Sequence, residues 1–432
     1  MSLPMSLFPP HETAPHLLLR VHSPLCHPAR LRKPRHCHSN HFGSKRRKRQ
    51  KRERESAGSS DPALKTIHFT RHEAAKANVL KVNVETSQLP RTKKGWIGKL
   101  QAQDGSEAPD VGPQTDPLPT GLGPHSYTQE DIDRLTGETG FSYVCWLGEI
   151  TIPVIDSHKT VFALLGGMPQ DLVGWKVATD GAADMMSRLS ADGHFTDEDA
   201  HHRRAHPETP YPSVSRGVSH GGGQTQPGEL CNHPANVKIT DEMMAHIFFR
   251  RIVGFTNCLA RVFAPILCVF FASQMARLAA WNPRLNWPFA GSIFAACTFN
   301  FGPRASTCPH LDFGNLAWGW CAITALGQFD ADRGGHLILW DLKLVIRFPA
   351  GSTIFIPSAI LRHSNIPVQP HERRFSFTQY SAGGLFRWIR NGFQTDESFE
   401  QTATDLEKQQ RAEDESTRWE DGLSMFSKLR DL

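Results

Sequence analysis

Short stretches in which apolar and polar residues alternate follow one another between residues 292 and 380. Each is rich in β-branched and aromatic residues and is bounded by glycine or proline turns, so each predicts a short strand. The predicted strands are residues 292–300, 318–326, 336–340, 342–348, 352–357 and 374–380. Short strands separated by turns at about ten-residue spacing are typical of a jelly roll or a small barrel.

The residues before these strands mix strand and helix patterns. Thr151–Ile155 and Val161–Leu165 predict two further strands, and Gly181–Leu189 predicts a helix. From Glu242 to Ala280 the apolar residues follow a helical period, which Pro265 divides in two. We expect these helices to brace the outer face of the barrel, and the predicted fold class is α+β.

Composition divides the chain into four regions. Residues 1–125 are basic, lack a sustained apolar period and are expected to be disordered. Residues 126–285 form a mixed α/β extension with the bracing helices, residues 286–394 the barrel core, and residues 395–432 an acidic C-terminal tail.

The charge lies at the two ends of the chain. Residues 1–60 carry 13 Lys or Arg and 3 acidic residues, whereas residues 395–432 carry 5 basic and 11 acidic residues. Since the whole chain has a net charge of +5, the part between is close to neutral. A near-neutral body is not typical of a strong duplex binder.

The basic run Lys45–Arg54 predicts nuclear localisation or a tether to nucleic acid, with a solvated charge block as the alternative. If this run does not direct the chain to the nucleus, the scattered cysteines and the lack of a signal peptide indicate the cytoplasm. The most apolar run, Val262–Ala272, is too short to span a membrane and contains a proline, so we expect no membrane partner.

The candidate chemistry lies among the predicted strands. His310 and Asp312 form a His-x-Asp triplet, and His363 follows about fifty residues later. Two imidazoles and one carboxylate on one face of a metal are the ligands of non-haem Fe(II) oxygenases. Arg374 and Ser376 share one face of a later strand, and an inward arginine suits the distal carboxylate of 2-oxoglutarate. A metal-free jelly roll, or a metal-binding cupin without 2-oxoglutarate, is the alternative; the cupin leaves Arg374 without a carboxylate partner.

Several segments resemble one family. HLDFGN begins at His310, and WCAITALGQFDADRGGHLILWDL, FPAGSTIFIPSA and RRFSFTQYSAGGLFRW follow it. Over residues 141–394 the chain resembles the fungal, basidiomycete-type 2-oxoglutarate/Fe(II) oxygenase domains of the TET/JBP type. The resemblance implies a double-stranded β-helix that uses Fe(II), 2-oxoglutarate and O2, with catalytic metal ligands His310, Asp312 and His363. It also implies that Asn315, three positions after the aspartate, holds a target base.

The chain departs from that family in two respects. It has no Cys-x-x-Cys motif, whereas animal TET enzymes carry a cysteine-rich zinc-binding region. The spacing from the second histidine to the arginine is also shorter. Both departures concern the nucleic-acid substrate more than the metal chemistry.

Three functions therefore stay open. The first is a dioxygenase that oxidises a methylated base in DNA, which requires the base to be flipped out of the duplex. The second is a hydroxylase of a protein or small molecule, and the third is a catalytically silent, transposon-derived barrel.

Two weaker substrate-side candidates, His220 and Gln224, lie in a glycine-rich loop. The histidine-rich residues 192–204 are expected to form a solvated loop. Protein partners cannot be inferred from the sequence.

Overall fold

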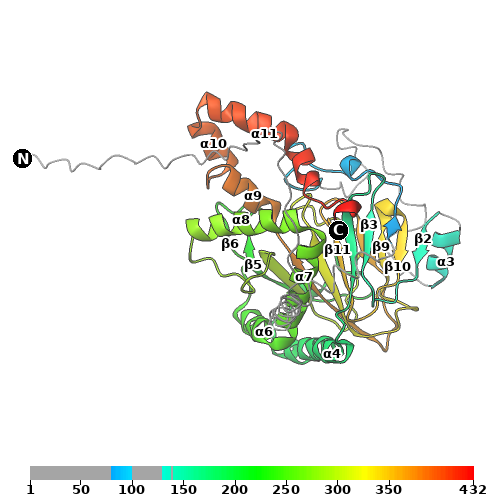
Figure 1. Ribbon diagram of the computed structural model, residues 1–432. Coiled ribbons are helices and arrows are strands. Elements are labelled where there is room, and N and C mark those ends of the chain that lie inside the picture. Colours follow the sequence, from blue (N-terminus) through cyan, green and yellow to red (C-terminus); the bar gives the residue numbers. More distant parts are fainter. Residues whose placement is uncertain (1–78, 100–128, 138–139) are drawn as a thin grey trace, which may run out of the picture. The chain divides into compact units, whose positions relative to one another are not determined.

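A computed structural model describes residues 79–99, 129–137 and 140–432 of the 432-residue chain. The predicted basic run Lys45–Arg54 lies outside these residues. Two β-sheets and the helices around them make up the described part, which is a mixed α+β structure as expected (Figure 1).

The large sheet has nine strands. In spatial order they are β1 (Leu80–Lys81), β3 (Ile152–Ile155), β4 (Val161–Gly167), β11 (Thr353–Ile356), β8 (Cys321–Gln328), β13 (Arg373–Tyr380), β7 (Ala296–Asn300), β5 (Ser213–Ser219) and β6 (Gly228–Glu229). All neighbours are antiparallel except β1 and β3.

The small sheet has four strands. Their spatial order is β12 (His363–Asn365), β9 (Leu337–Leu339), β10 (Leu344–Ile346) and β2 (Ser142–Val144). Beyond β12, the backbone of His310 pairs with that of His363 through two N–H···O bonds of 3.0 Å. The segment that carries His310 therefore extends the edge of this sheet.

From β7 onward the chain alternates between the two sheets. β7, β8, β11 and β13 enter the large sheet, whereas the His310 segment, the β9–β10 pair and β12 enter the small one. Side chains of both sheets line one pocket. The strands predicted between residues 292 and 380 are each present, and most of them are shorter than predicted.

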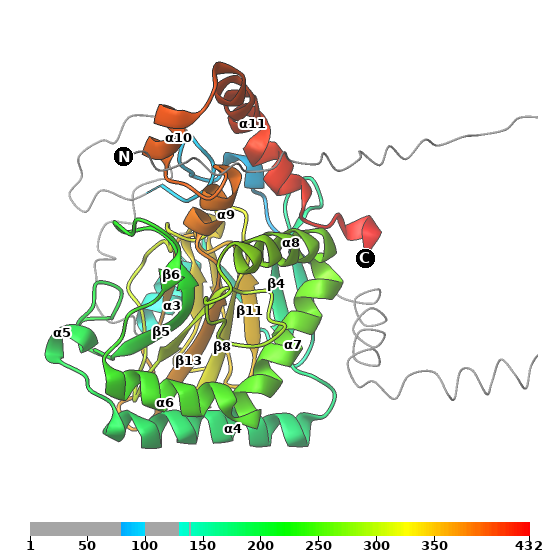
Figure 2. The same cartoon turned by 90° about the vertical axis from the view of Figure 1, so that its left-hand side faces the viewer.

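Helices cover one side of the large sheet (Figure 2). α4 (Leu172–Leu189) packs on β8 and β13, α6 (Pro234–Ala245) on β5, and α7 (Ile247–Phe263) on β4. The buried face of α4 and of α7 contributes apolar side chains to the main hydrophobic core. Within the run Glu242–Ala280 that was expected to brace the barrel, α7 packs on β4.

Pro265 breaks the helical run at the predicted point. α7 ends at Phe263, and α8 (Pro265–Trp281) begins with the proline, whose missing N–H is tolerated at a first helical position. Among the described residues, no single helix has the length and apolar character of a membrane span. α7 and α8 reach that limit only as a pair, which is bent by 119°.

Two regions differ from the expectations. The prediction that residues 1–125 are disordered is wrong for residues 79–99, where β1 pairs with β3 and Leu89 and Trp96 are buried. The acidic segment after residue 394 folds into α10 (Asp396–Thr402) and α11 (Asp405–Ser424). Trp419 of α11 is buried and donates a hydrogen bond to the carbonyl of Ser87, so these two regions pack together.

The remaining helices are short. They are α3 (Gln129–Gly137), α5 (Asp197–Ala200), α9 (Gly383–Arg390) and the 3-10 turns at Thr86–Gln88, Ser190–Asp192, Trp340–Leu342 and Leu429–Asp431.

Candidate metal centre and pocket

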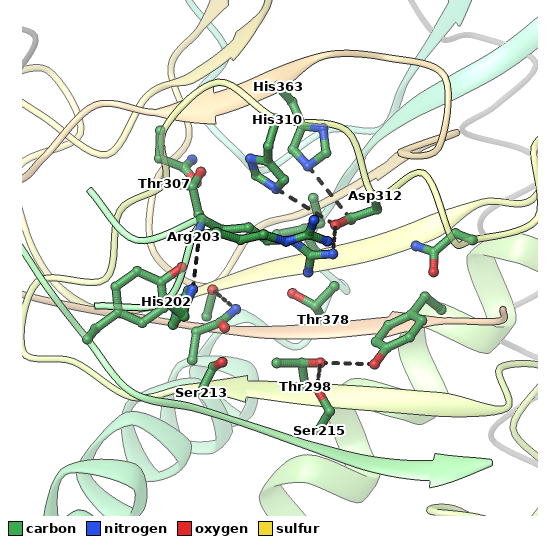
Figure 3. A pocket seen from close by; sticks show the side chains of 18 residues that line it. His202, Arg203, Ser213, Ser215, Thr298, Thr307, His310, Asp312, His363 and Thr378 are labelled. Carbon is green, nitrogen blue, oxygen red and sulfur yellow. Dashed lines mark hydrogen bonds and ion pairs between the residues drawn. The ribbon is translucent and has the colours of Figure 1, made fainter. Parts of the chain in front are cut away.

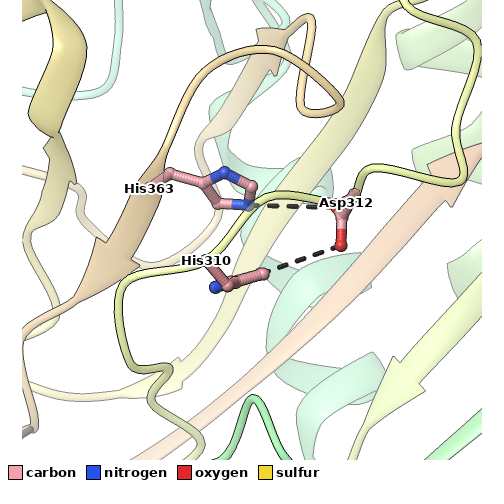
Figure 4. Close-up of side chains that lie close together, drawn as sticks. All are labelled: His310, Asp312 and His363. Atoms are coloured by element: carbon pink, nitrogen blue, oxygen red, sulfur yellow. Dashed lines mark ion pairs between the residues drawn. The ribbon is translucent and has the colours of Figure 1, made fainter. Parts of the chain in front are cut away.

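His310, Asp312 and His363 converge at the edge of the small sheet. One ligand atom from each lies within 4.8 Å of the others. His310 Nε2 is 3.8 Å from Asp312 Oδ1, and His363 Nε2 is 3.9 Å from Asp312 Oδ2 (Figure 4). Two ligand atoms that each lie about 2.1 Å from an ion, and subtend a right angle at it, are about 3 Å apart. An inward shift of less than about 1 Å by these side chains therefore brings all three to one metal.

The backbone fixes this convergence. His310 and His363 exchange their backbone hydrogen bonds, which places the two rings side by side with centroids 4.3 Å apart. Asp312 N donates to the carbonyl of Ser358 at 2.9 Å, which ties the aspartate to the chain after β11. The ligands come from segments far apart in sequence, and each is held by a paired backbone.

The second nitrogen of each imidazole also has a partner. His310 Nδ1 lies 2.7 Å from the carbonyl oxygen of Cys308, and His363 Nδ1 lies 2.8 Å from that of Leu361. A carbonyl accepts a hydrogen bond, so Nδ1 carries the proton and Nε2 of the neutral ring is free to bind a metal. This arrangement is typical of histidines that ligate metals.

The charges of the site suit a cation. Burial, and then His363, lower the pKa of His310 to about 3, so this ring is neutral at physiological pH. Burial alone would raise the pKa of Asp312, but Arg204 and the two histidines lower it to about 2. The site therefore presents an ionised carboxylate beside a neutral imidazole, the protonation states that metal ligands need.

Arg204 is a part of the site that the sequence analysis missed. Its Nη2 lies 3.0 Å from Asp312 Oδ1. We expected the histidine-rich residues 192–204 to form a solvated loop, yet His202, Arg203 and Arg204 all line the pocket. No local pattern pointed to this role, because it depends on contacts with residues a hundred positions away.

The pocket has a volume of about 300 Å³. Figure 3 shows His310, Asp312 and His363 on one side and Ser213, Ser215 and Thr298 on the other. Among the lining residues, Ile323 is the one aliphatic side chain, and the rest carry a hydroxyl, amide, imidazole, carboxylate or guanidinium group. Such a wall suits a ligand rich in hydrogen-bonding groups and disfavours an apolar one.

The polar wall opposite the metal triad is internally bonded. Ser215 and Thr298 share a hydrogen bond of 2.7 Å, and Thr298 donates to the Tyr380 hydroxyl at 3.3 Å. Ser376 accepts a bond of 2.9 Å from Asn300. These side chains come from β5, β7 and β13, whose antiparallel register places them in one layer.

Arg374 and Ser376 share a face of β13, as predicted, but occupy different depths. Ser376 lines the pocket, whereas Arg374 is buried and is not part of the lining. Arg374 Nη1 donates to the carbonyl of Ala305, and its Nε has no hydrogen-bond partner among the described residues. Burial lowers the pKa of Arg374 to about 10, so the group stays charged at neutral pH.

Asn315 lies at the pocket as expected. Its Nδ2 donates to Ser358 Oγ at 3.1 Å, and its backbone N–H donates to the carbonyl of Asp312. The backbone N–H of Asn315 therefore stabilises the turn after Asp312, and Asn315 also lines the cavity.

The two weaker candidates do not join the site. His220 is buried against Trp388, with ring centroids 5.1 Å apart, and Gln224 is exposed; neither lines the pocket. Arg373, the neighbour of Arg374 in sequence, pairs with Asp184 at 3.3 Å on the outside.

Comparisons with known proteins give a distant likeness only. No protein-family model matches the chain, and no curated protein matches it. Among solved structures it is similar to NgTET1 in complex with 5mC DNA, with 14% identity, 56% of this chain and 82% of that chain covered, and a TM-score of 0.39. It is also similar to a 2OG-Fe(II) oxygenase family oxidoreductase from Burkholderia pseudomallei, with 17% identity, coverages of 46% and 77%, and a TM-score of 0.27.

Proposed function

We propose that the chain is an Fe(II)- and 2-oxoglutarate-dependent dioxygenase. The observation that carries the proposal is the convergence of His310, Asp312 and His363 with both Nε2 atoms directed at the carboxylate. Two histidines and one carboxylate on one side of an ion are characteristic of non-haem Fe(II) oxygenases. The alternation of the chain between two sheets supports a double-stranded β-helix as the core.

The chain's own groups would bind the cosubstrate. Arg374 would pair with the distal carboxylate of 2-oxoglutarate, and Ser376 would add a hydroxyl. A buried guanidinium without a carboxylate partner is unfavourable, so an anionic ligand would stabilise this part of the pocket. When bound, the iron supplies the activation of O2 that couples decarboxylation of 2-oxoglutarate to oxidation of a C–H bond.

The substrate that we propose is a methylated nucleobase in DNA. The polar lining offers hydroxyl and amide partners for the edges of a base, and Asn315 is placed to be one of them. A base must leave the duplex to enter such a pocket. The basic run Lys45–Arg54 would hold the chain near DNA and direct it to the nucleus.

Mass spectrometry of methylcytosine-containing oligonucleotides tests this function. The protein is incubated with Fe(II), ascorbate and 2-oxoglutarate, and hydroxymethylcytosine is the expected product. The Asp312→Ala variant is the control and should give none. Succinate formation without a change in the DNA would instead indicate a hydroxylase of a protein or small molecule. If neither reaction occurs, the chain is a catalytically silent barrel.

A further inference from the structure

The backbone of Arg204 is fastened to the segment that carries the first candidate metal ligand. Cys308 N donates to the carbonyl of Arg204 at 3.0 Å, and Ala205 and Thr307 form an antiparallel bridge beside this bond. The carbonyl of Cys308 in turn accepts the bond of 2.7 Å from His310 Nδ1. Cys308 therefore connects the main chain of Arg204 to the imidazole of His310.

The side chain of Arg204 reaches the second candidate ligand directly. Its Nη2 lies 3.0 Å from Asp312 Oδ1. This oxygen is buried and accepts no aligned hydrogen bond from any residue that the structure describes, so the ion pair with Arg204 is the contact that stabilises its charge. Arg204 thus touches one ligand through its side chain and is linked to another through its backbone.

The triad by itself does not select one carboxylate oxygen. Asp312 Oδ1 lies 3.8 Å from His310 Nε2, and Oδ2 lies 3.9 Å from His363 Nε2, so each oxygen is about equally close to an imidazole (Figure 4). A carboxylate that gives both oxygens to a metal occupies one more coordination position than a carboxylate that gives one. The guanidinium on Oδ1 makes the two oxygens unequal, because Oδ2 has no cation beside it among the described residues.

We infer that Arg204 is a positioning residue for the metal centre, which retains Oδ1 of Asp312 and leaves Oδ2 as the single carboxylate oxygen for a divalent cation. The inference rests on the proposed function for the presence of a metal, but not on turnover. Residues that orient a metal ligand from outside contribute about 10- to 100-fold to metal affinity. The guanidinium also repels a cation, but its side chain is 41% exposed, so water screens this repulsion, whereas the contact with Oδ1 is direct.

Titration of the full-length protein with Co(II), after treatment with a chelator, tests the inference. Arg204→Ala should weaken Co(II) binding about 10- to 100-fold. It should also change the visible absorption of bound Co(II), which reports the number and geometry of the ligands. Arg204→Lys keeps a cation within reach of Oδ1, so it should bind Co(II) more tightly than Arg204→Ala and restore the absorption of the unaltered protein. The backbone bond from Cys308 is kept in both variants, so the melting temperature should change little.

Arg203→Ala is the matched control for the loss of a positive charge. Arg203 also lines the pocket, but its guanidinium lies over the Phe313 ring, 5.1 Å from the ring centroid. This variant should bind Co(II) no less tightly than the unaltered protein, and with the same absorption.

The possible results separate this inference from the proposed function. Unchanged or tighter Co(II) binding by Arg204→Ala, or equal weakening in Arg203→Ala, would overturn the positioning role. A lowered melting temperature in Arg204→Ala, with Arg204→Lys no better, would make the residue structural and overturn it too. No Co(II) binding by the unaltered protein would overturn both the inference and the proposed metal centre. Binding that depends on Arg204 in a protein without turnover would support the inference and remove the proposed reaction.

Discussion

The two faces of the pocket are built in different ways. The face that carries the candidate metal ligands lies at the edge of the small sheet, where His310 and His363 exchange backbone bonds and Asp312 N donates to Ser358 O. The opposite face is built on the paired strands β5, β7 and β13, and the side chains that it presents are bonded to one another through hydroxyls and amides. The first face offers imidazole and carboxylate atoms that a cation can bring together, whereas the second offers side-chain hydrogen bonds that a ligand can replace.

The largest expected effect is loss of the metal from the first face. His363→Ala should abolish Fe(II) retention, because only two of the three side chains that could hold the ion remain. Metal content after gel filtration measures it. The matched control is His233→Ala: His233 stacks on His194, with ring centroids 4.1 Å apart, in the other histidine-rich region. The control should keep its iron, and equal loss in both variants would contradict the assignment.

The second effect concerns the cosubstrate. Arg374→Ala should raise the 2-oxoglutarate concentration needed for half-maximal turnover by about 100-fold, because a buried carboxylate loses its charged partner. Arg373→Ala is the matched control. Arg373 is next to Arg374 in sequence, but its side chain pairs with Asp184 outside the pocket. A change of less than about twofold is expected there. An unchanged requirement in Arg374→Ala would move this role to another residue.

A smaller effect is expected at the substrate side. Asn315→Ala should raise the KM for a methylated oligonucleotide about tenfold, the cost of one hydrogen bond to a ligand. Iron content and the 2-oxoglutarate requirement should not change, because the Asn315 side chain bonds Ser358 and none of the three candidate metal ligands, and its backbone bond to Asp312 is kept. If iron is lost as well, the amide serves the turn after Asp312 and not the substrate.

The smallest effect tests the outer side of the small sheet. His336 is buried, and its Nε2 lies 3.3 Å from the Tyr143 hydroxyl; burial lowers its pKa from 6.5 to about 4. Below pH 6.5 the unfolded chain takes up a proton that the folded one does not, so stability falls as the pH drops toward 4. Between pH 7.5 and 5.5 this residue should cost about 1 kcal/mol.

Urea unfolding at these two pH values measures the slope. His336→Gln should show a loss smaller by about 1 kcal/mol over the same range, because glutamine does not titrate. An identical slope in both proteins would show that the acid sensitivity arises elsewhere.

The sequence predicted the first face well and the second poorly. The strands around the candidate metal ligands have local alternation and clear turns. His310 and Asp312 lie in the connection between β7 and β8, and His363 begins β12. Arg204 and Tyr211 join the site through pairing with residues 301–308, which no local period encodes. β5 carries three serines, an arginine and a glycine, so its strand character depends on its pairing with β7.

The ends of the chain were predicted less well for a similar reason. Residues 79–99 and α11 are polar by composition, and each buries a few large side chains against the other and against the body of the fold. Arg418 over the Trp96 ring, at 4.4 Å, is one such contact. Composition alone shows that these segments are charged, but it does not show which part of the chain they pack against.

The most direct test of the central claim is a crystal structure grown without oxygen in the presence of Fe(II), with anomalous scattering recorded at the iron edge. The account predicts one peak bounded by His310 Nε2, His363 Nε2 and a carboxylate oxygen of Asp312. An iron peak at another place, or none between these three atoms, would contradict it.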